Sequence, residues 1–129
     1  MKFQGRKISA GRAEGDALVT SMGISFYGGI DPETGRVMEK GHALEGQFIG
    51  GKILVFSTGK GSTVGSYTLY RLKKAGKAPA AILNAESETI TAVGCIISGI
   101  PCVDHIPIEQ ITTGMHVRVD TEGGIVEIL

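Results

Sequence analysis

One segment of the sequence combines residue types that bind anions and take part in proton transfer. It runs Ser57-Thr58-Gly59-Lys60-Gly61-Ser62-Thr63-Val64-Gly65-Ser66, with Ser62 in its middle. Hydroxyl and backbone N–H groups donate hydrogen bonds to anionic oxygens, and glycine lets a backbone approach a ligand closely. The segment therefore predicts a loop that holds an anionic group close to Ser62.

Two regular elements flank this loop and must position it. The preceding residues Lys52–Phe56 form an apolar run that is typical of a buried strand. After the loop, apolar residues recur at helical spacing from Val64 to Ala75, and Gly76 ends the helix. A strand, a glycine loop and a helix in this order direct free backbone N–H groups toward a ligand above the loop.

The same segment also fits a simple turn that caps a helix, which is a common use of Gly, Ser and Thr. It is not a nucleotide phosphate loop, because no Lys-Ser or Lys-Thr pair follows Gly65. The three glycines resemble a dinucleotide loop only loosely, and no acidic residue closes a second strand at the required distance. An anion site and a plain cap both remain open at this point.

Composition sets further bounds on the chain. Its 129 residues suffice for a single domain, residues 1–129, and its formal net charge of zero does not indicate binding to nucleic acid or an anionic membrane. It has no long apolar segment and no signal peptide, so we expect a cytoplasmic protein. Cys95 and Cys102 match no metal-binding spacing, which predicts two buried, reduced thiols and no metal held by this chain.

The residues before Gly50 form short, turn-separated segments, which predict a β-rich, antiparallel first half. Ile24, Phe26 and Ile30 alternate with polar or small residues, as in a strand that ends at a glycine turn. Asp31–Gly35 is a strong turn signal. The expected strands are Phe3–Ile8, Ala17–Thr20, Gly23–Ile30 and Val37–Met38, with turns at Gly11 and at Gly15-Asp16.

The second half alternates strands with helices. Strands are expected at Lys52–Phe56, Pro79–Asn84 and Ile100–Val103. Glu88–Ser98 is ambiguous, because its β-branched residues favour a strand, whereas its length and its place between strands favour a short buried helix. Such alternation predicts right-handed crossovers and a parallel layer. A hairpin of residues 115–120 and 125–129 closes the chain, so the predicted class is α/β.

Two motifs that occur together carry a resemblance to a known family. The first is Gly23-Ile24-Ser25-Phe26-Tyr27-Gly28-Gly29-Ile30-Asp31-Pro32 with Thr34-Gly35 and then His42; the second is Gly59-Lys60-Gly61-Ser62 with Gly65-Ser66 and then Ala78-Pro79-Ala80-Ala81. They resemble the small subunit of the aconitase X family, over most of the chain. The resemblance implies a swivelling β/β/α domain that forms a heterodimer with a large aconitase-like subunit. That subunit would hold a [4Fe-4S] cluster, with the active site between the two subunits.

Within this family the chain is most similar to archaeal members that act in isoprenoid biosynthesis. The resemblance implies a hydro-lyase, active only with its large subunit, that dehydrates (R)-5-phosphomevalonate to trans-anhydromevalonate 5-phosphate in an archaeal mevalonate pathway. The catalytic serine of the family falls on Ser62 as proton acceptor, and Lys60, Gly61 and Thr63 are the expected substrate-binding residues. The broader aconitase group often has Arg-Gly-Ser-Ser-Arg here, whereas this chain has Val64 in place of the second arginine. That difference fits a substrate with one carboxylate.

The chemistry of such a dehydration explains these residue types. It needs a positioned base beside the substrate carboxylate and a Lewis acid for the departing hydroxide. The two cysteines and three histidines show no ligand spacing, so a partner must supply the metal. Backbone N–H groups at the helix N-terminus would stabilise a negative oxygen at Ser62, and Lys60 would add a positive charge.

Other interpretations and residues remain to be tested. The alternatives are the small subunit of a hydroxyproline dehydratase, or a non-catalytic domain that binds an anion or assists assembly. We expect His42 at the surface, and His105 and His116 to be structural or solvated. Ser66 is expected to be a cap or turn hydroxyl, and Ser25–Gly29 either lines the site or packs internally.

Overall fold

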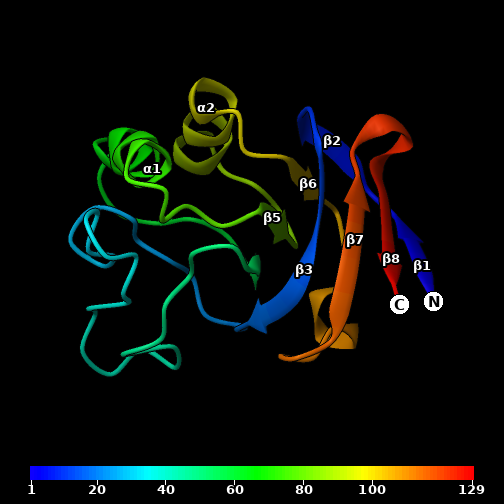
Figure 1. Cartoon of the computed structure of the whole chain (residues 1–129), viewed down its shortest axis with the longest axis horizontal. Coiled ribbons are helices and arrows are strands. Elements are labelled where there is room, and N and C mark those ends of the chain that lie inside the picture. The colour runs from blue at the N-terminus through cyan, green and yellow to red at the C-terminus, as the bar shows by residue number, and fades with distance from the viewer.

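Eight strands form one mixed sheet, and two α-helices cover part of it in the computed structural model, which describes residues 1–129 (Figure 1). The strand order is β1-β8-β7-β3-β4-β5-β6-β2. The strands are β1 (Lys2–Gln4), β2 (Arg6–Ser9), β3 (Arg12–Val19), β4 (Ile53–Phe56), β5 (Ala81–Asn84), β6 (Cys102–Asp104), β7 (His116–Asp120) and β8 (Ile125–Ile128). The helices are α1 (Gly65–Lys74) and α2 (Thr89–Ser98), with short 3₁₀ turns at η1 (Ile108–Gln110) and η2 (Glu122–Gly124).

Strand β3 connects two different parts of this sheet. Its first residues, Arg12–Asp16, pair antiparallel with β7, and its last three, Ala17–Val19, pair parallel with β4. β7, β8 and β1 continue the antiparallel part, whereas β4, β5 and β6 continue the parallel part. Figure 1 shows β3 between the two parts, with the helices on the side away from β7 and β8.

The parallel strands separate two apolar cores because successive side chains of a strand point to opposite faces. Leu54, Phe56 and Ile82 face the helices and pack with residues of α1 and α2. Ile53, Val55 and Leu83 face the other way and pack against the antiparallel strands. The result is three layers, antiparallel strands, parallel strands and helices, which is the predicted β/β/α arrangement.

Much of the predicted fold is confirmed. β4, β5 and β6 pair in parallel, as expected from the strand and helix alternation, and they lie side by side in chain order. The segment from Glu88 to Ser98 is a helix that begins at Thr89 and ends before the left-handed Gly99. β7 and β8 form the predicted closing hairpin.

The details predicted for the first half need correction. Phe3–Ile8 is two strands, β1 and β2, at opposite ends of the strand order. Gly15-Asp16 is no turn but lies inside β3, where a Cβ on Gly15 would come within 3.0 Å of the Gly51 carbonyl oxygen. Gly15 therefore allows two backbones to approach closely. A sequence alone does not distinguish such a glycine from one in a turn.

The segment between β3 and β4 is irregular, contrary to the strands predicted there. Isolated bridges join Ile30 to Val37 within the segment and Ile24 to Gly59 in the loop after β4. The predicted turn after Ile30 is confirmed, because the Asp31 carboxylate accepts a hydrogen bond from the Glu33 N–H at 2.9 Å. Apolar side chains fix the segment to the helix-side core; they are Ile24, Phe26, Ile30, Val37, Leu44 and Ile49.

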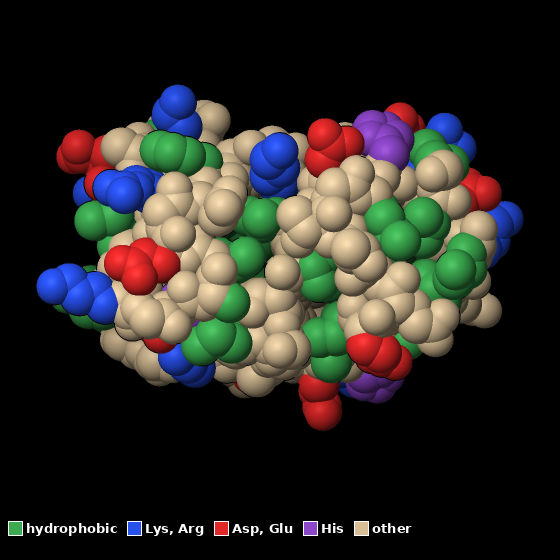
Figure 2. Space-filling view, turned by 90° about the horizontal axis from the view of Figure 1, so that it is seen from below, with side chains coloured by type: hydrophobic (Ala, Val, Ile, Leu, Met, Phe, Trp, Pro, Cys, Tyr) green, Lys and Arg blue, Asp and Glu red, His purple; other side chains and the backbone are tan.

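The surface shows no dominant charge on the face in Figure 2. Basic, acidic and apolar side chains are interspersed there, in keeping with the formal net charge of zero. Neither α1 nor α2 has the length and hydropathy needed to cross a membrane.

Candidate active site

The loop with Ser62 lies where the parallel strands end. β4 ends at Phe56, and α1 begins at Gly65. Residues that follow β5 hold the base of the loop: the Asn84 side-chain amide donates to the Phe56 carbonyl at 3.1 Å, and the Glu86 N–H donates to the Ser57 carbonyl at 3.2 Å. The loop thus lies at the carboxyl ends of the parallel strands, which is the usual place for ligand sites in open α/β sheets.

Ser62 is exposed and sits at the start of α1. Its Oγ accepts a hydrogen bond from the Val64 N–H at 3.2 Å, and its carbonyl oxygen accepts one from the Gly65 N–H at 2.9 Å. The N–H groups of Gly61, Ser62 and Thr63 form no hydrogen bond within the chain. The positive end of α1 and these donors would stabilise a negative oxygen at Ser62, although a serine in a simple turn before a helix makes the same Oγ contact.

The glycines of the loop are required by packing. Gly61 has φ +92°, and a Cβ there would collide with the Ser25 hydroxyl. A Cβ on Gly59 would collide with the Glu88 carboxylate and the Thr91 hydroxyl. The path of the loop is therefore set by close contact with the first motif on one side and with α2 on the other. Ser25 accordingly lies beside the loop.

Glu88 is a residue that the sequence did not single out. Its carboxylate accepts hydrogen bonds from the Ile90 and Thr91 N–H groups, both at 2.7 Å, and so caps α2. Glutamate is not among the residues preferred at an N-cap, so only its place just before a helical run could have pointed to it. Because Glu88 occupies the N-terminus of α2, the free helix N-terminus at the site is that of α1.

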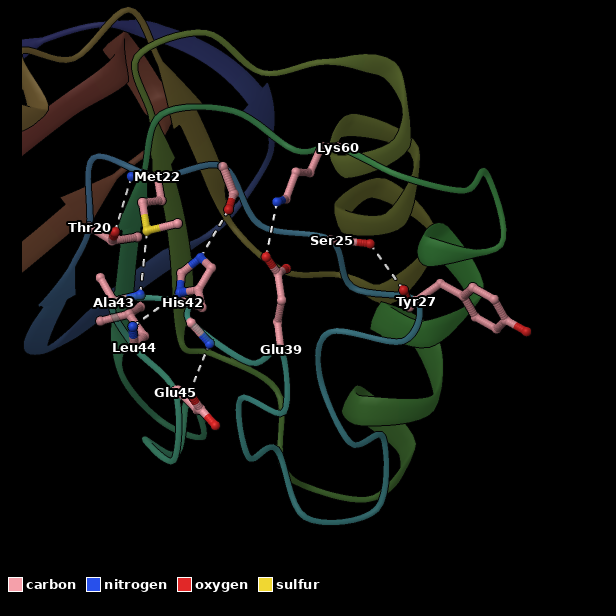
Figure 3. Close-up of polar contacts among 12 residues, drawn as sticks. Thr20, Met22, Ser25, Tyr27, Glu39, His42, Ala43, Leu44, Glu45 and Lys60 are labelled. Carbon is pink, nitrogen blue, oxygen red and sulfur yellow. Dashed lines mark hydrogen bonds and ion pairs between the residues drawn. The ribbon is translucent and has the colours of Figure 1, made fainter.

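The Lys60 side chain points toward the Glu39 side chain, as Figure 3 shows. Its ammonium lies 3.1 Å from the Glu39 carboxylate, and the two side chains are 48% and 30% exposed. Its backbone N–H donates to the Ile24 carbonyl at 3.0 Å. The predicted contact between Lys60 and a substrate would therefore require the ammonium to leave Glu39.

His42 is buried, so its predicted surface location is wrong. Only 5% of the residue is exposed. Its Nδ1 accepts from the Leu44 N–H at 3.0 Å, so Nε2 carries the hydrogen and donates to the Gly23 carbonyl at 3.0 Å (Figure 3). His42 thereby joins two irregular segments from the inside, and it is no free base beside Ser62.

We expect His42→Ala to lower the free energy of unfolding by about 2–3 kcal/mol, because it leaves two backbone groups unpaired and a cavity behind. Urea unfolding of the purified chain measures this loss. The control is His105→Asn at an exposed position, where asparagine tolerates the positive φ of 60°. Equal midpoints for His42→Ala and the wild type would contradict the structural role.

The remaining loop hydroxyls have separate surroundings. Ser66 is buried and donates to the Ile90 carbonyl at 2.7 Å, which links α1 to α2 and agrees with a non-catalytic role. Thr63 is exposed and borders a groove of about 380 Å³ between the two helices. Side chains of Tyr67, Val93 and Ile97 make this groove largely apolar.

A polar network supports the same edge of the sheet. The Asp104 side chain, fully buried at the end of β6, receives hydrogen bonds from Arg6 at 2.9 and 2.7 Å and from the Ser87 N–H at 2.9 Å. Burial acts to raise the pKa of Asp104, but these hydrogen bonds and the charge of Arg6 outweigh it and lower the pKa below its ordinary value. The Ser87 hydroxyl continues the network to Asn84 at 2.7 Å.

The other candidate metal or acid–base residues lie outside the loop. Cys95 and Cys102 are buried and unbonded, as predicted. The neighbouring Cys102 thiol raises the pKa of Cys95, and burial adds to this effect. His116 is exposed, and its hydrogen bonds to Asp16 and Glu14 raise its pKa. No group of three or more His, Cys, Asp or Glu residues is arranged to hold a metal ion.

Comparison with known proteins agrees with this geometry. Residues 2–128 match the family described as the aconitase X swivel domain. A Thermococcus kodakarensis protein named phosphomevalonate dehydratase small subunit is 57% identical over 129 residues, which is 100% of this chain and 97% of the relative. A Methanocella arvoryzae protein of the same name is 54% identical over 131 residues, with 99% of each chain covered.

Solved structures show the same fold. The crystal structure of Thermococcus kodakaraensis aconitase X in its holo-form superposes with a TM-score of 0.98 at 56% identity, covering 100% of this chain and 98% of that one. A solution NMR structure of a UPF0107 protein gives a TM-score of 0.91 at 50% identity, covering 100% and 99%. With a β/β/α fold, the two motifs side by side and matches along its whole length, the chain belongs to the aconitase X swivel domain family.

Proposed function

We propose that this chain is the small subunit of a phosphomevalonate dehydratase, a hydro-lyase that converts (R)-5-phosphomevalonate to trans-anhydromevalonate 5-phosphate. The names of relatives that are 57% and 54% identical along almost their whole length support the substrate. The observation that carries the proposal is Ser62, whose exposed Oγ accepts the Val64 N–H at 3.2 Å at the start of α1.

In this proposal Ser62 accepts the proton from the carbon next to the substrate carboxylate. A serine alkoxide is strongly disfavoured in water, so the site must stabilise a negative Oγ. In this proposal the Val64 N–H, 3.2 Å from Oγ, and the positive end of α1 supply that stabilisation. One such donor in a preorganised site contributes about a hundredfold or more to a rate. The unpartnered N–H groups of Gly61 and Thr63 would bind the substrate carboxylate or its enolate-like form.

The residues of this chain do not fit an iron–sulfur cluster. Its two cysteines are buried, and no set of three ligand residues converges. We therefore assign the [4Fe-4S] cluster to a large subunit, where it would supply the Lewis acid that assists departure of hydroxide. The Ser62 loop would face that subunit in a cytoplasmic heterodimer, with Lys60, Gly61 and Thr63 at the substrate.

Two alternative functions differ from this proposal, one in its substrate and one in having no catalytic role. A hydroxyproline dehydratase would use the same fold and loop with another substrate. A non-catalytic anion-binding domain is consistent with the Ser62–Val64 contact, because that contact also stabilises the turn before α1. Neither receives support from the names of the relatives.

The test is to assay the chain alone and with its large subunit. We expect the isolated chain to be folded, colourless, free of bound iron and inactive, because it lacks a ligand set for the cluster. The reconstituted complex should dehydrate phosphomevalonate and leave hydroxyproline unchanged. Iron content, the visible absorption spectrum and product formation are the measurements.

Two results would contradict the proposed function. One is stoichiometric iron or turnover in the chain alone. The other is a complex with a full cluster that releases no anhydromevalonate phosphate. Turnover of hydroxyproline instead would identify the first alternative.

A further inference from the structure

We propose that Glu39 sets the affinity of the site for its anionic substrate by competing with that substrate for the Lys60 ammonium. The inference rests on the proposed function, because it assumes an anion at the Ser62 loop. It goes further by assigning a role to a residue in neither sequence motif.

On the lysine side of the ion pair, neighbouring groups hold the Lys60 backbone and the stem of its side chain in place. The Lys60 N–H donates to the Ile24 carbonyl at 3.0 Å, and the Ile24 N–H donates to the Thr58 carbonyl at 3.2 Å. The aliphatic part of the Lys60 side chain runs beside Gly23, where a Cβ would lie 3.5 Å from its Cδ. This path brings the ammonium to 3.1 Å from Glu39 Oε2.

The glutamate side is fixed as well. The Glu39 carbonyl accepts a hydrogen bond from the His42 N–H at 3.3 Å, and the Met38 N–H donates to the Gly29 carbonyl at 2.8 Å. The buried His42 ring then reaches back to the Gly23 carbonyl at 3.0 Å. The buried His42 ring thus connects the backbone near Glu39 with the backbone beside Lys60. Figure 3 shows the side chains of Glu39 and Lys60 pointing toward each other.

The Lys60 ammonium can leave Glu39 and pair with another anion. Both side chains are partly exposed, at 48% for Lys60 and 30% for Glu39, and ion pairs in such surroundings are weak. Lysine is a point charge on a flexible stem, so its ammonium can turn to another anion. Lys60 directly precedes Gly61, whose N–H is unpartnered in the chain. An anion at that N–H and the Glu39 carboxylate therefore compete for one ammonium.

Competition for the Lys60 ammonium predicts a change in substrate binding and no change in the rate of the chemical step. In the reconstituted complex we expect Glu39→Gln to lower KM for phosphomevalonate by about two- to fivefold, the range that one exposed ion pair supplies. The value of kcat should stay unchanged, because neither residue receives the proton. Lys60→Ala should raise KM, and adding Glu39→Gln to Lys60→Ala should then change nothing.

Glu45→Gln is the matched control. It removes one negative charge from the same segment, and the glutamine oxygen can still accept the Gly41 N–H that Glu45 accepts at 2.9 Å. Its KM should equal that of the wild type. An increase in KM for Glu39→Gln, or an equal decrease with and without Lys60, would overturn the proposal.

A second measurement separates this proposal from the assigned reaction. Inorganic phosphate is titrated against the complex, and its dissociation constant is obtained from the shift in unfolding temperature. We expect Glu39→Gln to bind phosphate about two- to fivefold more tightly, and the difference to vanish in the Lys60→Ala background. Absence of phosphomevalonate turnover together with this phosphate result would refute the reaction and retain the competition. Equal phosphate affinities for Glu39→Gln and the wild type would refute the competition.

Discussion

The Ser62→Ala complex is expected to turn over phosphomevalonate at about one hundredth of the wild-type rate or less, because a positioned base contributes about that factor. Exchange of solvent hydrogen at the carbon that loses its proton should fall in parallel. The variant also removes the acceptor of the Val64 N–H in the turn before α1, which costs about 1 kcal/mol of stability as the loss of one hydrogen bond. The decisive measurements are turnover and hydrogen exchange in the complex.

Two further variants distinguish a catalytic role of Ser62 from a role in stabilising the turn before α1. Ser62→Asn keeps an oxygen that can accept the Val64 N–H but cannot act as the same base, so it should recover stability without activity. Ser66→Ala removes the buried hydroxyl that donates to Ile90, so it should lose about 1 kcal/mol of stability and keep most of the turnover. Near-normal exchange in Ser62→Ala would instead place the base on the large subunit.

Gly61→Ala should lower kcat by about ten- to a hundredfold while the chain stays folded. Its φ of +92° is unfavourable for alanine, and the new Cβ would collide with the Ser25 hydroxyl. The loop must shift to relieve this collision, and a displacement of about 1 Å at a reacting group costs up to about a hundredfold in rate. Steady-state kinetics of the complex gives kcat and KM separately.

The chain offers both a control and a rescue for this variant. Gly76→Ala introduces the same methyl at φ +72° with open space around it, so it should leave kcat unchanged. Ser25→Gly, combined with Gly61→Ala, removes the atoms that the new Cβ meets and should restore part of the lost rate. A double variant as slow as Gly61→Ala alone would show that backbone strain, and not the Ser25 contact, misplaces Ser62.

The elements predictable from the sequence are those with a regular pattern. The apolar run of β4 and the helical spacing of α1 are local signals, and they place Ser62 between a strand end and a helix start. The parallel pairing of β4, β5 and β6 follows from the alternation of strands with helices. Local patterns are therefore sufficient to locate the central loop of the site.

The rest of the site depends on contacts between distant segments. His42 reaches Gly23, Lys60 reaches Glu39, and Gly59 touches Glu88. Most of these residues lie in irregular stretches without periodicity, so no local pattern indicates which of them meet. Gly15 shows the same limit, because a glycine for close packing and a glycine for a turn are identical in a sequence.

The pairing of the first strand with the last has a consequence for how the chain can be joined to other proteins. β1 pairs with β8, and the Ile128 N–H donates to the Met1 carbonyl at 2.8 Å, so both termini emerge together at the edge of the sheet remote from α1 (Figure 1). A short linker could close the chain into a ring, which makes circular permutants with new ends in exposed turns feasible. A purification tag or a covalently tethered large subunit can be attached at either terminus, and its point of attachment stays clear of the Ser62 loop.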